Sequence, residues 1–227
     1  MFSLEVKSIC IFNIFTAKIG LLFLLIHSFL MLEGNYLKNT EKIFLNPFKT
    51  IVMKQVNLKN IPQDIEAFTQ IRNEIANSPE GGAATFVLAM ILFEKDRKMG
   101  TDALTMVLDR SNLVESMNGY KGFSPGQSIK YHLGRFDAKP YWGRSYILGT
   151  SPENAYALPE QLNVETLRNA TSEQSNGDVK IFVKCTGADS HRPITLRAND
   201  KGIWKAVECS SMFLDMRTPQ QIISDDL

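Results

Sequence analysis

Residues 78–93 read SPEGGAATFVLAMILF, and this stretch decides the fold. Ser78 is a typical helix N-cap, Pro79 suits the first helical position, and Glu80 lies favourably near the positive end of the helix dipole. From residue 83 to residue 93 every side chain but one is apolar. A helix without a polar face must be buried, and this run is too short to cross a bilayer. We therefore predict a buried central helix that forms the core.

Gly81 and Gly82 lie in the first turn of this helix, where a glycine pair could cradle a phosphate. The chain, however, contains neither GxxxxGK[ST] nor GxGxxG, and no strand-turn-helix pattern leads into the pair. We expect instead that the glycines allow the first turn to pack closely against a neighbouring element. No cofactor is expected.

Helical spacing continues on both sides of the central helix. The segment before it, with Pro62 in the first turn, repeats apolar residues every three or four positions: Ile61, Ile65, Phe68, Ile71 and Ile75. A further helix is expected from Thr101 to about Asp109. Another should open at Ser124, which has capping-box spacing to Gln127, and bury Ile129, Leu133 and Phe136. Together these segments predict an N-terminal layer of about four helices.

After Pro140 the pattern changes to short alternating segments separated by Gly, Pro, Asn and Asp. Strands are expected at 144–148, from Ala155, at 162–168 and at 179–185, followed by a hairpin that begins at Ile194. The fold class is therefore α+β, with the helical layer packed on a C-terminal antiparallel sheet of about five strands.

The hairpin has a predictable register. Residues 199–202 read NDKG, which favours a type I turn with Gly202 in the left-handed region, so that Asn199 lies opposite Ile203. Trp204 then faces the core, and Cys209 lies on the face opposite Trp204. We expect no disulfide between Cys185 and Cys209.

Residues 1–52 form an apolar leader of different composition, without Arg, Asp or Gln, and the single α+β domain is predicted at 53–227. Ile19–Leu32 is an apolar run of 14 residues. Two interpretations stay open: a membrane anchor through residues 9–32, or a mis-called start with translation beginning at Met53. The protein would be membrane-anchored in the first case and cytoplasmic in the second. A cleaved signal peptide is disfavoured because no A-x-A-like site follows.

Composition and spacing exclude several classes of function. The formal net charge is +1 with both signs interspersed, so we predict no nucleic-acid partner. Cys185, His191 and Cys209 lack the local pairing of a zinc site, and no metal is expected. Asp189, Ser190 and His191 are adjacent, which prevents their side chains from converging as a catalytic triad. We therefore assign no catalytic residue.

Two polar loops remain as the candidate binding surface. One is GTSPEN at 149–154 and the other GADSHR at 187–192, and both carry side chains suited to a protein or small-molecule partner. The candidate residues are Glu153, Asn154, Asp189, His191 and Arg192. Whether the two loops lie together is left open by the sequence.

Three functions are compatible with this pattern. We favour a non-enzymatic binding or protein-interaction domain that acts through these loops. An alternative is a small hydrolase or isomerase that uses an acid pair, such as Asp189 and Glu208, in a pocket of the sheet. A membrane-tethered accessory protein is the third, and a membrane partner depends on the leader being real.

Three segments carry a family resemblance: SPEGGAATFVLAMILF, RSYILGTSPENAYALP and CTGADSHRPITLRANDKGIWKAVECSS. Together with the later MRTP they resemble an uncharacterised bacterial domain-of-unknown-function family. The resemblance runs from about Ile61 to Pro219. It implies a domain with no established catalytic residues to carry over.

Overall fold

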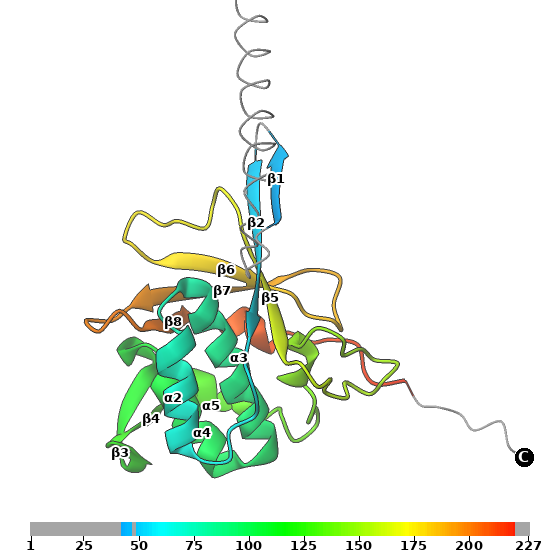
Figure 1. Ribbon diagram of the computed structural model, residues 1–227. Coiled ribbons are helices and arrows are strands. Elements are labelled where there is room, and N and C mark those ends of the chain that lie inside the picture. The colour runs from blue at the N-terminus through cyan, green and yellow to red at the C-terminus, as the bar shows by residue number, and fades with distance from the viewer. Residues whose placement is uncertain (1–41, 47–48, 221–227) are drawn as a thin grey trace, which may run out of the picture. The chain divides into compact units, whose positions relative to one another are not determined.

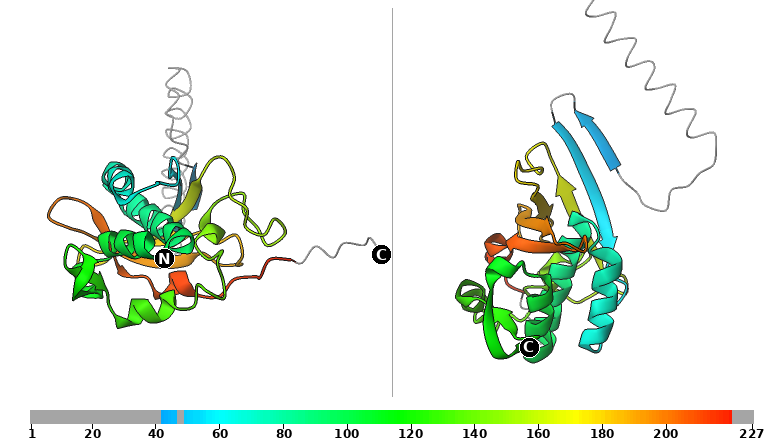
Figure 2. Two further views of the ribbon diagram at one scale, coloured as in Figure 1. Left: turned by 90° about the horizontal axis from the view of Figure 1, so that it is seen from below. Right: turned by 90° about the vertical axis from the view of Figure 1, so that its left-hand side faces the viewer.

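The computed structural model describes residues 42–46 and 49–220. Four α-helices form one layer of the domain: α2 (Ile65–Ile75), α3 (Pro79–Lys95), α4 (Arg97–Val107) and α5 (Gln127–Leu133). Three short 3-10 helices accompany them: η1 (Arg110–Asn112), η2 (Arg144–Tyr146) and η3 (Ser210–Phe213). In Figure 1 and in both views of Figure 2 the helices gather on one side of the main sheet.

The main sheet has six antiparallel strands in the order β1-β2-β5-β6-β7-β8. Their bounds are β1 (Lys42–Asn46), β2 (Lys49–Asn57), β5 (Asn163–Arg168), β6 (Val179–Val183), β7 (Arg192–Ala198) and β8 (Trp204–Glu208). A separate hairpin consists of β3 (Leu113–Tyr120) and β4 (Phe123–Pro125). The predicted α+β class is confirmed, since helices cover an antiparallel sheet.

Helix α3 forms the core, as its sequence predicts. The Ser78 hydroxyl accepts a hydrogen bond from Gly81 N at 3.2 Å and caps the helix, and every residue from Pro79 to Phe93 is buried. The helix contacts β2, β5, β6, β7 and β8, so it crosses the sheet. Gly82 makes this close approach possible, because a Cβ there would lie 2.8 Å from Leu196 Cδ2 and 2.9 Å from Trp204 O.

Three helix starts differ from the prediction. Helix α4 begins at Arg97 rather than at Thr101, because the Asp96 carboxylate accepts a hydrogen bond from Met99 N at 2.9 Å and acts as the N-cap. Helix α2 begins at Ile65 rather than at Pro62, because the Asp64 carboxylate accepts a hydrogen bond from Ala67 N at 2.7 Å and acts as the N-cap. Helix α5 begins after Gly126 without a side-chain cap. The expected capping box fails because Ser124 belongs to β4, where it pairs with Val114. The predicted burial of Ile129, Leu133 and Phe136 is confirmed.

The expected strands at 144–148 and from Ala155 are wrong. Residues 144–146 form η2, where Ser145 and Tyr146 are buried and donate to the carbonyls of Trp142 and Met212. The positive φ of Ala155, 52°, does not suit a strand. The alternation predicted for β6 is confirmed, with Val179, Ile181 and Val183 buried, whereas burial does not alternate in β5, where Glu165 is buried between Val164 and Thr166.

The β7–β8 hairpin has the predicted register at its turn. Asn199 N donates to Ile203 O at 2.9 Å, Ala198 pairs with Trp204, and Gly202 has a φ of +72°. The alternation then shifts, because a bulge lies between the pairs Leu196–Ala206 and Thr195–Glu208.

This bulge changes the side-chain environment that the hairpin register predicts for Cys209, which lies past it, is 2% exposed and joins the core. Trp204 lies before the bulge and packs against the core as predicted, although it is only partly buried. Cys185 and Cys209 are both buried free thiols.

The predicted boundary at residue 53 lies inside a strand. Strand β2 runs across Met53, and Val52 pairs with Arg168 of β5. The anchor expected at residues 9–32 lies outside the residues that the structure describes. Within the described part of the chain, no helix is long and apolar enough to span a bilayer.

Candidate functional site

The first predicted loop, 149–154, holds its own shape through Asn154. The side-chain amide of Asn154 donates to Gly149 O at 2.9 Å, while its Oδ1 accepts from Ser151 N at 2.8 Å. Gly149 has a φ of +90°, a conformation that glycine adopts without strain. The predicted binding residue Asn154 is therefore engaged in positioning the loop.

The two loops are joined through Thr186 and through residues 214–220, the C-terminal segment. Thr150 Oγ1 lies 2.9 Å from Thr186 Oγ1, just before the second loop. Arg217 N donates to Gly187 O at 2.9 Å, and Gln220 N donates to Pro152 O at 2.9 Å. We call the two loops, 149–154 and 187–192, together with residues 214–220 the sheet-end surface.

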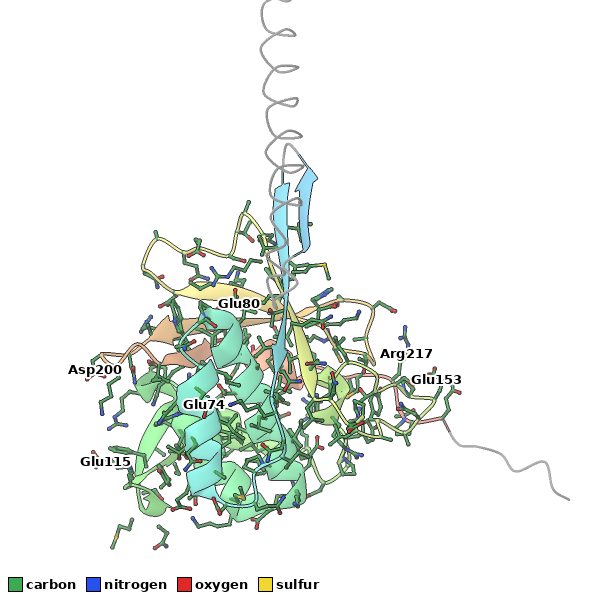
Figure 3. All side chains as sticks on the ribbon, in the orientation of Figure 1. Glu74, Glu80, Glu115, Glu153, Asp200 and Arg217 are labelled. Atoms are coloured by element: carbon green, nitrogen blue, oxygen red, sulfur yellow. The ribbon has the colours of Figure 1, made fainter. Side chains whose placement is uncertain are left out.

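Opposite charges face each other on the sheet-end surface. Asp189 forms an ion pair with Arg217, and the hydrogen bond and charge of Asp189 raise the pKa of Arg217. Hydrogen bonding to the Ser151 side chain lowers the pKa of Glu153, with a further contribution from Arg217. Figure 3 labels Glu153 and Arg217 near each other on this side of the domain. Asp189 stays 89% exposed despite its ion pair.

His191 and Arg192 are less accessible than their loop position suggests. Arg192 opens β7, and its Nη2 donates to Asp215 O at 2.8 Å. Burial lowers the pKa of His191, which favours the neutral imidazole. A shallow hollow of about 440 Å³ lies between the second loop and the C-terminal segment, with Asp189, Arg192 and Arg217 in its wall.

Sequence reasoning missed the side chains that hold the C-terminal segment. Five backbone carbonyls of residues 212–217, in η3 and the C-terminal segment, accept hydrogen bonds from side chains that come from distant parts of the chain. The pairs are Met212 with Tyr146 at 2.8 Å, Phe213 with Arg135 at 3.3 Å, Leu214 with Trp142 at 3.2 Å, Asp215 with Arg192 at 2.8 Å, and Arg217 with Tyr156 at 2.5 Å. The only sequence signal was the density of aromatic residues at 141–146, where Tyr141, Trp142 and Tyr146 lie within six positions.

The acid pair considered from the sequence is not assembled. Asp189 pairs with Arg217, whereas Glu208 Oε1 accepts from Ser210 N at 2.8 Å. Hydrogen bonding to the Ser210 side chain, and next to the Ser210 backbone, lowers the pKa of Glu208. Glu208 is not among the residues that line the hollow beside Asp189. Within residues 42–46 and 49–220, no group of three or more His, Cys, Asp or Glu side chains gathers as a metal site.

Comparison with protein-family models assigns most of this chain to a known family. Residues 60–220 match the family model described as "Domain of unknown function (DUF6935)". The chain belongs to this family. The DUF6935 match agrees with the resemblance seen in the sequence, and it includes both loops and the C-terminal segment that joins them. Comparisons with curated proteins and with solved structures found no significant match.

Proposed function

We propose that this DUF6935 domain is a non-enzymatic protein-interaction domain and that its partner binds the sheet-end surface. The observation that carries the proposal is the junction of the two loops, 149–154 and 187–192, by residues 214–220. Segments far apart in the sequence thereby present Glu153, Asp189 and Arg217 together, and all three side chains reach solvent.

Hydrogen bonds within the surface favour binding. The backbone of each loop is hydrogen-bonded to the C-terminal segment, so a partner loses little free energy in ordering the two loops. The exposed acids and Arg217 provide a mixed charge pattern, which favours a matching partner and disfavours partners with like charges at the same positions. The hollow beside Asp189 is shallow, which suits a protein contact better than an enclosed small molecule.

A charge-reversal variant tests the proposal. The double variant Glu153→Lys with Asp189→Lys inverts the acidic part of the surface, whereas Glu66→Lys with Glu115→Lys changes the net charge equally at exposed positions on α2 and β3. Cross-linking and affinity capture from the native source would be compared for the wild type and both variants. We expect a partner that the control retains and the loop variant loses.

The same partner would then be titrated against the purified proteins. An unchanged affinity in the loop variant, with its fold verified by circular dichroism, would contradict the proposal.

A further inference from the structure

A second concave site lies away from the sheet-end surface. It is a groove of about 730 Å³, bounded by α2, α4, the β3–β4 hairpin and the turn between β7 and β8. Figure 1 shows α2, β3, β4 and β8 on one side of the domain, and Figure 3 labels Asp200 and Glu115 on that side. The volume falls within the range of small-molecule pockets.

The groove carries an excess of positive charge. Five basic side chains line it against a single carboxylate, that of Asp200; they are Arg72, Arg110, Lys121, Lys201 and Lys205. None of the five forms an ion pair within the described residues, whereas five other arginines of the domain do: Arg97, Arg144, Arg168, Arg197 and Arg217. Five cations without an ion-pair partner among the described residues therefore share one hollow of a chain whose net charge is only +1.

Arg72 of α2 and Lys205 of β8 form the inner part of the groove, and both are half-buried. Burial lowers the pKa of Lys205, and the nearby charge of Arg72 lowers it further, against the opposing effects of Asp109 and Asp200. Burial also lowers the pKa of Arg72. Two like charges in a partly desolvated wall disfavour each other, and an anion placed between them removes that repulsion.

Part of the remaining wall of the groove is apolar and aromatic. Met106, Leu113 and Ile203 line it together with two aromatic rings. The Arg110 guanidinium lies 3.9 Å above the Phe123 ring, and Lys121 Nζ lies 5.4 Å from the centre of the Tyr120 ring. Such a wall can hold an apolar body beside the charged group. An inorganic ion without an organic body would make no contact with this apolar wall.

We propose that this groove binds a small organic anion. A phosphate or carboxylate group lies between Arg72 and Lys205, and an apolar or aromatic body contacts Met106, Leu113 and Ile203. Arg110 and Lys121, which are stacked on aromatic rings, add positive charge at the rim. The inference is independent of the proposed protein partner, because the groove shares no residue with the sheet-end surface.

Isothermal titration of the purified full-length chain with four probes tests the proposal. Phenyl phosphate and benzoate each combine an anion with an aromatic body, inorganic phosphate lacks the body, and benzyl alcohol lacks the charge. We expect phenyl phosphate, benzoate or both to bind with a Kd below about 1 mM. Each aromatic anion that binds should do so at least about tenfold more tightly than inorganic phosphate and benzyl alcohol. Whether phenyl phosphate or benzoate binds better identifies the anionic group.

Matched variants localise the binding. Arg72→Gln and Lys205→Gln should each weaken the tighter probe at least about tenfold, since each removes a charge-assisted contact in a half-buried site. Lys180→Gln removes the same charge from β6, outside the groove, and should leave the Kd unchanged. Arg72→Lys keeps the charge, and it should bind the probe more tightly than Arg72→Gln if Gln substitution acts through charge rather than through misfolding.

Three results would overturn the proposal. The first is that neither aromatic anion binds below about 1 mM. The second is that inorganic phosphate or benzyl alcohol binds as tightly as the aromatic anions. The third is that folded Arg72→Gln and Lys205→Gln bind the probes as the wild type does. None of these results bears on the sheet-end surface, whose partner is tested with Glu153 and Asp189.

Discussion

Substitution of Gly82 by alanine should destabilise the domain, although alanine is the better helix former. Gly82 lies in the first turn of α3, and a Cβ there would lie 2.8 Å from Leu196 Cδ2 and 2.9 Å from the backbone oxygen of Trp204. The leucine side chain can move, but the Trp204 carbonyl belongs to β8 and is held by the sheet. The methyl group therefore pushes the helix away from the sheet.

The expected change in the free energy of unfolding is the difference between opposing effects. Greater helix propensity favours alanine by up to about 1 kcal/mol, and burial of the methyl group favours it by about 0.8 kcal/mol. Overpacking against rigid backbone opposes both, at about 1–3 kcal/mol and occasionally more. Because the contact with Trp204 involves backbone, we place the cost at the upper end and expect a net loss of about 1–2 kcal/mol. For a domain of this size, Tm should fall by about 2–8 °C.

Thermal and urea unfolding of Gly82→Ala and a matched control would measure this loss. Gly134 ends α5 with a φ of −60°, and a Cβ there would meet only Tyr131 O at 3.6 Å and Lys130 O at 3.7 Å. Gly134→Ala should therefore be neutral or stabilising by up to about 1 kcal/mol. If Gly82→Ala proved as stable as the wild type, the close packing of α3 on β8 would not explain why position 82 is a glycine.

Three further predictions concern ionisable groups. Burial raises the pKa of Glu94 to about 7 from 4.5, so folding favours its protonated form. The stability of the domain should therefore fall as the pH rises from 4.5 through 7. Urea titrations at several pH values should show a flatter pH dependence for Glu94→Gln. Burial raises the pKa of Cys209 to about 12, and Cys185 is also buried, so a thiol reagent should label both only after unfolding; rapid labelling of the native protein would contradict their placement. Asp189→Asn removes an exposed ion pair with Arg217, and Tm should be unchanged, which differential scanning calorimetry would check.

Local signals predicted those parts of the fold that depend on nearby residues. Ser78 caps α3 as expected, and Val179, Ile181 and Val183 of β6 alternate into the core. The turn at Asn199 also set the first pairs of its hairpin. In each case the deciding contact is within a few residues, or the burial pattern repeats with the period of the element.

The errors arose where distant contacts override local pattern. The hairpin β3–β4 went unrecognised because β3 lacks two-residue alternation, with Val114 and Glu115 both exposed in succession. Residues 144–148 have strand-like composition, yet Tyr146 turns inward to bind Met212 O. Because of the bulge near Thr195, Cys209 lies in the core rather than on the predicted face, and no residue in the hairpin sequence indicates this bulge.

The candidate sites were partly predictable for the same reason. Polar composition pointed to both loops of the sheet-end surface, but not to the C-terminal segment that joins them, because the joining contacts span up to 68 residues between Pro152 and Gln220. The basic groove was missed because Arg72, Lys121 and Lys205 come from separate elements and form no cluster in the sequence.

The way in which the C-terminal segment is held has a consequence for mutational tolerance. Trp142, Arg192 and Tyr156 donate to the backbone carbonyls of the exposed residues Leu214, Asp215 and Arg217. Every amino acid has a backbone carbonyl, so these contacts restrict the identity of the donors and not that of the exposed residues. Leu214, 49% exposed, and Asp215 should accept many substitutions, whereas positions 142, 156 and 192 should accept few. Across DUF6935 proteins, the segment could therefore diverge at its outward positions and give each protein a different surface on the same scaffold.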